Sequence, residues 1–338
     1  MAAHPVTLTV SPGRSGTTFL ARTLLEHFGR DAEVHHEFLW HPDTKPAVFH
    51  RRTDDAAKRE MLANPAVRAT VDRWAELSER RPVVDFGWTM RGLIPVFRDV
   101  LGDRLRVLVV HRHPVSVAAS FAAMGAYARW RSPDDHSAPD HPRALFPQFR
   151  DRWPGMTAYE RMLYLWLEVT ASGLEWAERL PAETVRVEKA DDFFADPDRI
   201  GAIAAFCGFP GDPIPPSPTR NRIERRDRET FPMRDQWRRT FDHPELLSLA
   251  DELGYDMSEA TVRSLAEKYR LPDGLGPRLR CATGYWTWRN RAGLLAKSLG
   301  VRWAGARATR PESFRGGRAA VLTGGRGGDA YDLPPGKH

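Results

Sequence analysis

The residues best suited to chemistry lie near the start of the chain, in the loop from Ser11 to Thr18, which reads SPGRSGTT. Small residues allow several backbone N–H groups to converge in a tight loop, and the dipole of a following helix adds partial positive charge. Arg14 contributes a full positive charge, and the hydroxyl groups of Thr17 and Thr18 are further hydrogen-bond donors. This combination predicts a binding site for a phosphate or sulfate group.

The loop differs from the Walker A pattern of nucleoside triphosphatases, G-x-x-x-x-G-K-[ST]. Gly16-Thr17-Thr18 stands where Gly-Lys-Thr would, so the Walker lysine is missing and Arg14 is the available cation. The sequence also shows no clear strand that ends in a magnesium-binding aspartate. Because nucleoside triphosphatases depend on that lysine and metal ion, the loop favours an anionic ligand that needs no metal.

A second candidate site follows an apolar run that begins at Val107. Arg112 comes directly after this predicted strand, and Pro114 is well placed for the first turn of a helix that carries Ser120. A guanidinium group can hold a phosphate through two parallel hydrogen bonds. The competing interpretation of Arg112 is a surface charge at a helix start. Ser120 taken alone would be an ordinary helical serine, and only its spacing from Arg112 indicates a role for it.

Together the two stretches resemble the sulfotransferases that use 3′-phosphoadenosine 5′-phosphosulfate (PAPS). The family's first motif, [KR]-S-G-[TS]-[TS], holds the 5′-phosphosulfate, and Arg14-Ser15-Gly16-Thr17-Thr18 matches it. Its second motif is a strand, then Arg-[DNH]-Pro and a helical serine that hold the 3′-phosphate; Arg112-His113-Pro114 and Ser120 match it. The arginine of the first motif is similar to the bacterial, carbohydrate and tyrosylprotein branches rather than the lysine-bearing cytosolic steroid and phenol branch. The resemblance covers roughly residues 6–255.

The resemblance implies a general base, because the acceptor hydroxyl must lose its proton when it attacks sulfur. The arginine-loop branches place a glutamate just past the first helix, and Glu37 matches that position. His36 and His35 are the alternatives, since imidazole titrates near neutral pH. A solvated loop carboxylate without a catalytic role is the competing interpretation of Glu37. Arg14 is expected to stabilise charge on the leaving side.

The elements that must position these residues alternate along the chain. Strands are predicted at 6–10, 82–86, 107–112 and 184–188, and helices at 19–28, within 54–80, and at 91–101, 157–180, 197–207 and 244–253. Such alternation predicts an α/β fold, with a P-loop-like, mainly parallel sheet flanked by helices on both faces. Ligands of these folds bind beyond the carboxyl ends of the strands, where both motifs would lie.

Three regions are expected, the first of which contains an insertion. Residues 1–256 would form the α/β domain, with a loop-rich insertion over the acceptor site at about 126–156. Residues 257–310 would form a helical extension rich in tryptophan and basic residues, and 311–338 a disordered Gly/Arg-rich tail.

The net charge of +6 suits an anionic ligand, and it also suits nucleic acid or an anionic membrane. The basic run at 220–239 is interleaved with acidic residues, which favours a solvated surface over a nucleic-acid stripe. Trp286, Trp288 and Trp303 lie among further basic residues. We expect a helix docked on the core there, with association at a membrane surface as the alternative.

The two cysteines, Cys207 and Cys281, exclude a disulfide framework and CxxC metal clusters. The chain has no apolar signal segment and no run long enough to span a membrane, so the expected location is the cytoplasm.

The sequence therefore predicts a sulfotransferase that needs no metal and transfers a sulfuryl group from PAPS to a small-molecule, sugar or glycolipid hydroxyl, with an amine as the less expected acceptor. No nucleic-acid partner is expected. Two alternatives stay open: a P-loop kinase or other nucleotide-binding protein, and a non-catalytic protein that binds anions or nucleic acid.

Overall fold

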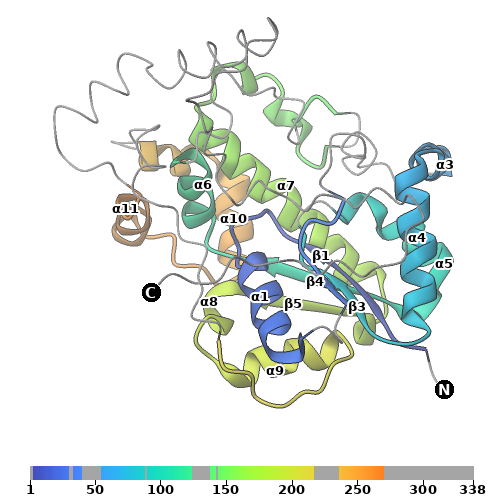
Figure 1. Cartoon of the computed structure of the whole chain (residues 1–338). Coiled ribbons are helices and arrows are strands. Elements are labelled where there is room, and N and C mark those ends of the chain that lie inside the picture. Colours follow the sequence, from blue (N-terminus) through green and yellow to red (C-terminus); the bar gives the residue numbers. More distant parts are fainter. Residues whose placement is uncertain are drawn as a thin grey trace, which may run out of the picture.

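The centre of the molecule is a parallel five-stranded sheet in the order β2-β3-β1-β4-β5 (Figure 1). The computed structural model describes residues 3–29, 33–39, 55–87, 90–123, 138–141, 144–216 and 236–269. The strands are β1 (Val6–Val10), β2 (Glu33–His35), β3 (Val83–Asp85), β4 (Leu105–His111) and β5 (Val185–Lys189). The predicted α/β fold with a mainly parallel sheet is confirmed.

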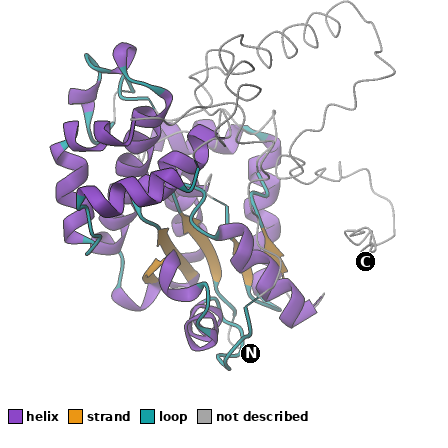
Figure 2. Ribbon diagram, turned by 90° about the vertical axis from the view of Figure 1, so that its left-hand side faces the viewer, coloured by secondary structure: helices purple, strands orange, loops and turns teal. Residues whose placement is uncertain are grey.

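Helices cover both faces of the sheet, so the molecule has three layers (Figures 1 and 2). On one face lie α1 (Thr17–Phe28), α8 (Ala190–Phe193) and α9 (Pro197–Phe206). On the other lie α4 (Pro65–Ser78), α5 (Ile94–Leu101), α6 (Pro114–Ala123), α7 (Ala158–Arg179), α10 (Pro244–Glu252) and α11 (Glu259–Glu267). The short α3 (Asp55–Ala63) precedes α4.

Strand β4 shows why the sheet must be covered on both sides. Val107 and Val109 belong to the core beneath α7, whereas Leu108 and Val110 belong to the core beneath α1 and α9. Neighbouring residues of a strand point to opposite faces, so a run that is apolar throughout buries both.

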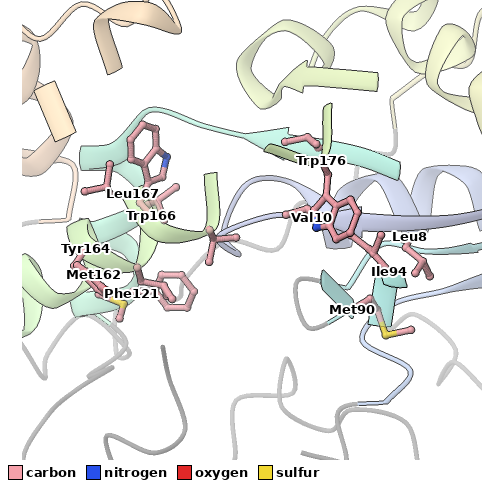
Figure 3. Close-up of a cluster of buried hydrophobic side chains, with 14 of the residues drawn as sticks. Leu8, Val10, Met90, Ile94, Phe121, Met162, Tyr164, Trp166, Leu167 and Trp176 are labelled. Atoms are coloured by element: carbon pink, nitrogen blue, oxygen red, sulfur yellow. The ribbon is translucent and has the colours of Figure 1, made fainter. Parts of the chain in front are cut away.

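Helix α7 is the longest described helix and the main cover of the first core. It starts with a capping box, in which Thr157 Oγ1 accepts the Glu160 N–H and Glu160 accepts the Thr157 N–H. Gly173 lets the helix lie close to the sheet, because a Cβ there would come within 2.7 Å of Val109 Cγ1 and 3.2 Å of Val10 Cγ1. Figure 3 shows Trp176 beside Val10 in this core. The helix predicted at 157–180 is confirmed.

Strand β2 was not predicted from the sequence. It has three residues and pairs with β3 at the edge of the sheet, with His35 opposite Asp85. Three residues are too few to display a recognisable alternation, so only the pairing identifies the strand. The helix predicted at 91–101 starts instead as a 3-10 turn, Met90–Leu93, and becomes α5 before Pro95.

Helix α11 packs against α6, and its Val262 and Ala266 join the core that contains β1. The first part of the predicted extension at 257–310 therefore lies on the α/β core, while residues 270–338, including the predicted tail, lie outside the described residues. Of the predicted insertion at 126–156, residues 138–141 and 144–156 are described; they include two 3-10 turns, Pro147–Phe149 and Trp153–Gly155. None of the helices within the described ranges is long and apolar enough to span a membrane.

Candidate active site

The loop after β1 is shaped by left-handed backbone conformations. Gly13, Arg14 and Gly16 have φ values of 78°, 56° and 89°. Ser11 Oγ accepts the Gly13 N–H at 3.2 Å, and Ser15 Oγ donates to the Gly13 carbonyl at 3.1 Å. Loops of this kind direct backbone N–H groups into a small concave space, here at the start of α1. The backbone shape suits an anion, and anion binding stays a prediction.

Gly16 also permits a close approach from the segment that follows β5. A Cβ at this position would lie 2.8 Å from Phe194 Cε1 and 3.1 Å from Phe193 Cε2. Phe19 on α1 packs against the same two rings, with centroids 6.2 Å from Phe193 and 5.4 Å from Phe194. The segment after β5 thus forms an aromatic wall behind the loop.

Arg14 connects the first motif to the second. Its Nε donates a hydrogen bond to Ser120 Oγ at 3.0 Å, and Ser120 is buried on α6. The contact forms because β1 and β4 are parallel neighbours, so their carboxyl ends and the segments that follow them meet at one edge of the sheet.

Arg112 lies at the same edge, directly after β4. Its Nε is 3.4 Å from Asp191 Oδ1, and its guanidinium carbon lies 5.4 Å from the centroid of the Phe194 ring. Trp166 Nε1 donates to the Arg112 carbonyl at 2.8 Å, which fixes the backbone. The buried Nε makes no hydrogen bond among the described residues, since its contact with Asp191 is an ion pair only. An incoming anionic oxygen would satisfy it.

Two buried histidines flank Arg112. His111 Nδ1 is 2.6 Å from the Tyr255 hydroxyl, and burial lowers the pKa of His111 to about 4. His113 Nδ1 accepts the Val115 N–H at 3.3 Å, so its Nε2 must carry the proton that is donated to the Asp256 carbonyl at 3.1 Å. Both histidines therefore attach the turn between α10 and α11 to the second motif.

His36 contacts the first loop directly. Its Nε2 lies 3.0 Å from Thr18 Oγ1 and 3.3 Å from Thr17 Oγ1. Burial, followed by the positive charges of Arg22 and Arg14, lowers the pKa of His36 to about 4. The ring is therefore neutral at pH 7 and shares the hydroxyl groups predicted to contact the anion.

Glu37 lies in the turn after β2 and has a left-handed φ of 57°. Its backbone N–H donates to Asp85 Oδ1 at 3.1 Å. Asp85 is the last residue of β3, within the strand predicted at 82–86. Its two carboxylate oxygens accept three backbone N–H groups, from Glu37, Phe38 and Gly87, and this explains the burial of the carboxylate.

Sequence reasoning missed Asp85, Asp191, Phe194 and Trp166 as parts of this edge. The Asp85-x-Gly87 spacing, typical of a side chain that bonds to the backbone two residues later, was the available signal for Asp85. The other three come from elements distant in the sequence and carry no comparable local signal.

Among the described residues, no group of three or more His, Cys, Asp or Glu side chains is placed to hold a metal ion. The basic run at 220–239 falls mostly outside the described residues, which resume at residue 236. Cys281 and the tryptophans at 286, 288 and 303 also lie outside them.

No protein-family model matches the chain, and no curated protein matches it. Among solved structures, it is similar to the sulfotransferase domain from the curacin biosynthetic pathway, with 14% identity, a TM-score of 0.43, and coverage of 76% of this chain and 99% of that one. It is similar to the sulfotransferase domain of the Synechococcus olefin synthase, with 15% identity and a TM-score of 0.36. This match covers 84% of this chain and 96% of that one. It is also similar to a sulfotransferase from Alicyclobacillus acidocaldarius, with 19% identity and a TM-score of 0.41. This match covers 78% of this chain and 100% of that one.

Proposed function

We propose that this chain is a sulfotransferase that transfers a sulfuryl group from PAPS to a hydroxyl group of an acceptor. The observation that carries the proposal is the hydrogen bond between Arg14 Nε and Ser120 Oγ. At one edge of the parallel sheet, it joins the stretch proposed to hold the 5′-phosphosulfate to the stretch proposed to hold the 3′-phosphate, and these two stretches together carry the resemblance in the sequence.

The residues at this edge are compatible with a donor that carries two separate anionic groups. The left-handed loop at 13–16 and the start of α1 offer backbone N–H groups for the 5′-phosphosulfate. For the 3′-phosphate, Arg112 offers a buried Nε that makes no hydrogen bond among the described residues, and Ser120 offers a hydroxyl. Two anchors in fixed relative positions would discriminate against nucleotides that lack a 3′-phosphate.

In the proposed reaction the acceptor oxygen attacks sulfur, and the bond between sulfur and the bridging phosphate oxygen breaks. Charge accumulates on that bridging oxygen, where Arg14 and the loop N–H groups would stabilise it. Most of the rate enhancement would come from alignment and charge stabilisation, since no covalent enzyme intermediate is needed.

The acceptor proton would pass to Glu37, the proposed general base. The neighbouring His36 would stay neutral and orient the hydroxyl groups of Thr17 and Thr18, because its Nε2 already lies against them. This division of roles assigns proton transfer to the carboxylate and loop organisation to the imidazole.

Isothermal titration calorimetry with adenosine 3′,5′-bisphosphate and with ATP, each with and without Mg²⁺, tests the proposal. Tight, magnesium-independent binding of the bisphosphate is expected. A screen with sulfur-labelled PAPS and hydroxylated acceptors, sugars and glycolipids included, then tests transfer. Magnesium-dependent ATP binding would indicate a kinase, and bisphosphate binding without transfer to any acceptor would indicate a binding protein.

A further inference from the structure

The carboxylate of Asp85 is completely buried at the carboxyl end of β3 and lies against the turn that carries Glu37. Its Oδ1 accepts the Glu37 N–H at 3.1 Å and its Oδ2 accepts the Phe38 N–H at 2.9 Å. Oδ1 also accepts the N–H of Gly87. One side chain therefore fixes the backbone on both sides of the Glu37 Cα atom.

The turn is constrained from a second direction by Gly87. A Cβ at this position would lie 2.9 Å from Glu37 Cα, 3.0 Å from Glu37 N and 2.6 Å from Asp85 Oδ1. The Phe86 N–H donates to the His35 carbonyl at 3.0 Å, which holds the two strand ends together just before the turn. Only a residue without a side chain fits between the Asp85 carboxylate and the Glu37 backbone.

These contacts maintain an unfavourable backbone conformation at Glu37. A left-handed φ of 57° is uncommon for a residue with a side chain, and such conformations persist only where surrounding contacts impose them. The three N–H donors to Asp85 and the close packing of Gly87 are such contacts. They determine the direction in which the Glu37 side chain leaves the backbone.

The hydrogen bonds to Asp85 oppose the cost of burying its charge. Burial raises the pKa of Asp85 above its usual value, and His35 with the N–H groups of Phe38, Gly87 and Glu37 offsets only part of that rise. Each observed partner of the carboxylate is an N–H donor, the arrangement that stabilises an ionised carboxylate.

We propose that Asp85, together with Gly87, is a positioning residue that holds Glu37 in the orientation needed for proton transfer. The inference rests on the proposed function, in which Glu37 is the general base. Asp85 itself contacts neither donor nor acceptor; it acts through the backbone of residues 37 and 38.

The test is a double-mutant cycle of Asp85→Asn and Glu37→Gln in the full-length protein. The asparagine side chain would keep the shape but present an amide N–H₂ to one of the three backbone donors, so the turn should loosen. We expect single-turnover transfer to fall about 10- to 100-fold, as when a reacting group is displaced by about an ångström. Bisphosphate affinity should stay unchanged, and hydrogen exchange at the Glu37 and Phe38 amides should accelerate.

In the Glu37→Gln background, Asp85→Asn should lower the transfer rate very little further, because Glu37, the residue through which Asp85 acts, has already lost its carboxylate. If the losses of transfer rate in Asp85→Asn and Glu37→Gln were fully additive in the double variant, Asp85 would be a general structural residue and the inference would be overturned. Loss of bisphosphate binding in Asp85→Asn alone would have the same meaning. Asp196→Asn is the control: like Asp85, Asp196 accepts backbone N–H groups, in its case two, and they lie at the start of α9. It should leave transfer unchanged.

Gly87→Ala provides the second arm, because its new methyl group would press on both Asp85 Oδ1 and the Glu37 backbone and so displace the same turn while residue 85 stays an aspartate. If Asp85→Asn fails to fold, the cycle is run with Gly87→Ala, and additivity with Glu37→Gln overturns the inference. A wild-type protein that binds bisphosphate but transfers no sulfuryl group overturns the proposed function and this inference together. Additivity in an active wild-type enzyme overturns the inference alone.

Discussion

Arg14 Nε donates to Ser120 Oγ at 3.0 Å, although the two residues are 106 positions apart in the sequence. Arg14 belongs to the loop after β1, and Ser120 to the helix after the neighbouring strand β4. The proposed sites for the two ends of the donor are therefore mechanically connected. A change at either residue should affect both ends.

Arg14→Ala should lower turnover more than it lowers bisphosphate affinity, because the charge that Arg14 would meet grows as the sulfur–oxygen bond breaks. Arg14→Lys should retain more activity than Arg14→Ala, since it keeps the charge but loses the planar guanidinium. Steady-state kinetics and calorimetry measure the two effects. An unchanged kcat with a raised KM would show instead that Arg14 binds the ground state and the transition state equally.

Arg112→Ala should weaken adenosine 3′,5′-bisphosphate binding by about 1.5–3 kcal/mol, the range for hydrogen bonds to charged groups. Binding of adenosine 5′-phosphate, which has no 3′-phosphate, should change much less. Arg106→Ala is the matched control, because Arg106 lies on β4 and donates to the carbonyl of Phe206. If Arg112→Ala weakened the binding of both nucleotides equally, Arg112 would not be a ligand of the 3′-phosphate.

Asp191→Asn should strengthen bisphosphate binding. The Asp191 carboxylate lies 3.4 Å from Arg112 Nε, so an incoming phosphate must compete with it. Because both side chains are partly exposed, the gain should be below about 1 kcal/mol, and it should shrink at high salt. Calorimetry at two salt concentrations measures it. Weaker binding would mean that Asp191 orients Arg112 rather than competing for it.

Glu37→Gln should reduce turnover by roughly 10²–10⁴-fold with near-normal donor binding, the size expected for loss of a general base. His36→Asn should reduce turnover far less than Glu37→Gln does. The wild-type rate should rise with pH as the base loses its proton, and that rise should be absent in Glu37→Gln. An alkyl or sugar hydroxyl is the best acceptor, because its proton cannot leave unaided. Retention of rate in Glu37→Gln with loss in His36→Asn would assign the base to His36.

The protein should lose stability as pH falls from about 6.5 to 4. The folded-state pKa of His111 is lowered to about 4 by burial, below the usual value of about 6.5, so in this window the unfolded chain binds the extra proton. One such proton changes the free energy of unfolding by up to about 1.4 kcal/mol per pH unit. His111→Gln should flatten this dependence, as urea titrations across the range would show. An unchanged slope would mean that other groups govern acid unfolding.

Much of the fold was predictable because its elements carry local signals. β1 and β4 are apolar runs that end in turn or charged residues, and α7 combines a capping box with a long apolar pattern. β2 was not predictable, since three residues at a sheet edge show no period. The missed boundary at Met90–Leu93 arose because 3-10 and α-helical turns share similar spacing at a helix start.

The parallel α/β class and the residue types of both proposed anion motifs could be predicted, because they depend on the local spacing of apolar, small and charged residues. Three contacts arise only in the folded chain: Arg14 with Ser120, the Phe194 ring with Gly16 and Arg112, and Asp85 with the backbone of Glu37. Each of these contacts joins segments distant in the chain. Their geometry follows from strand order and helix packing, which no local pattern encodes.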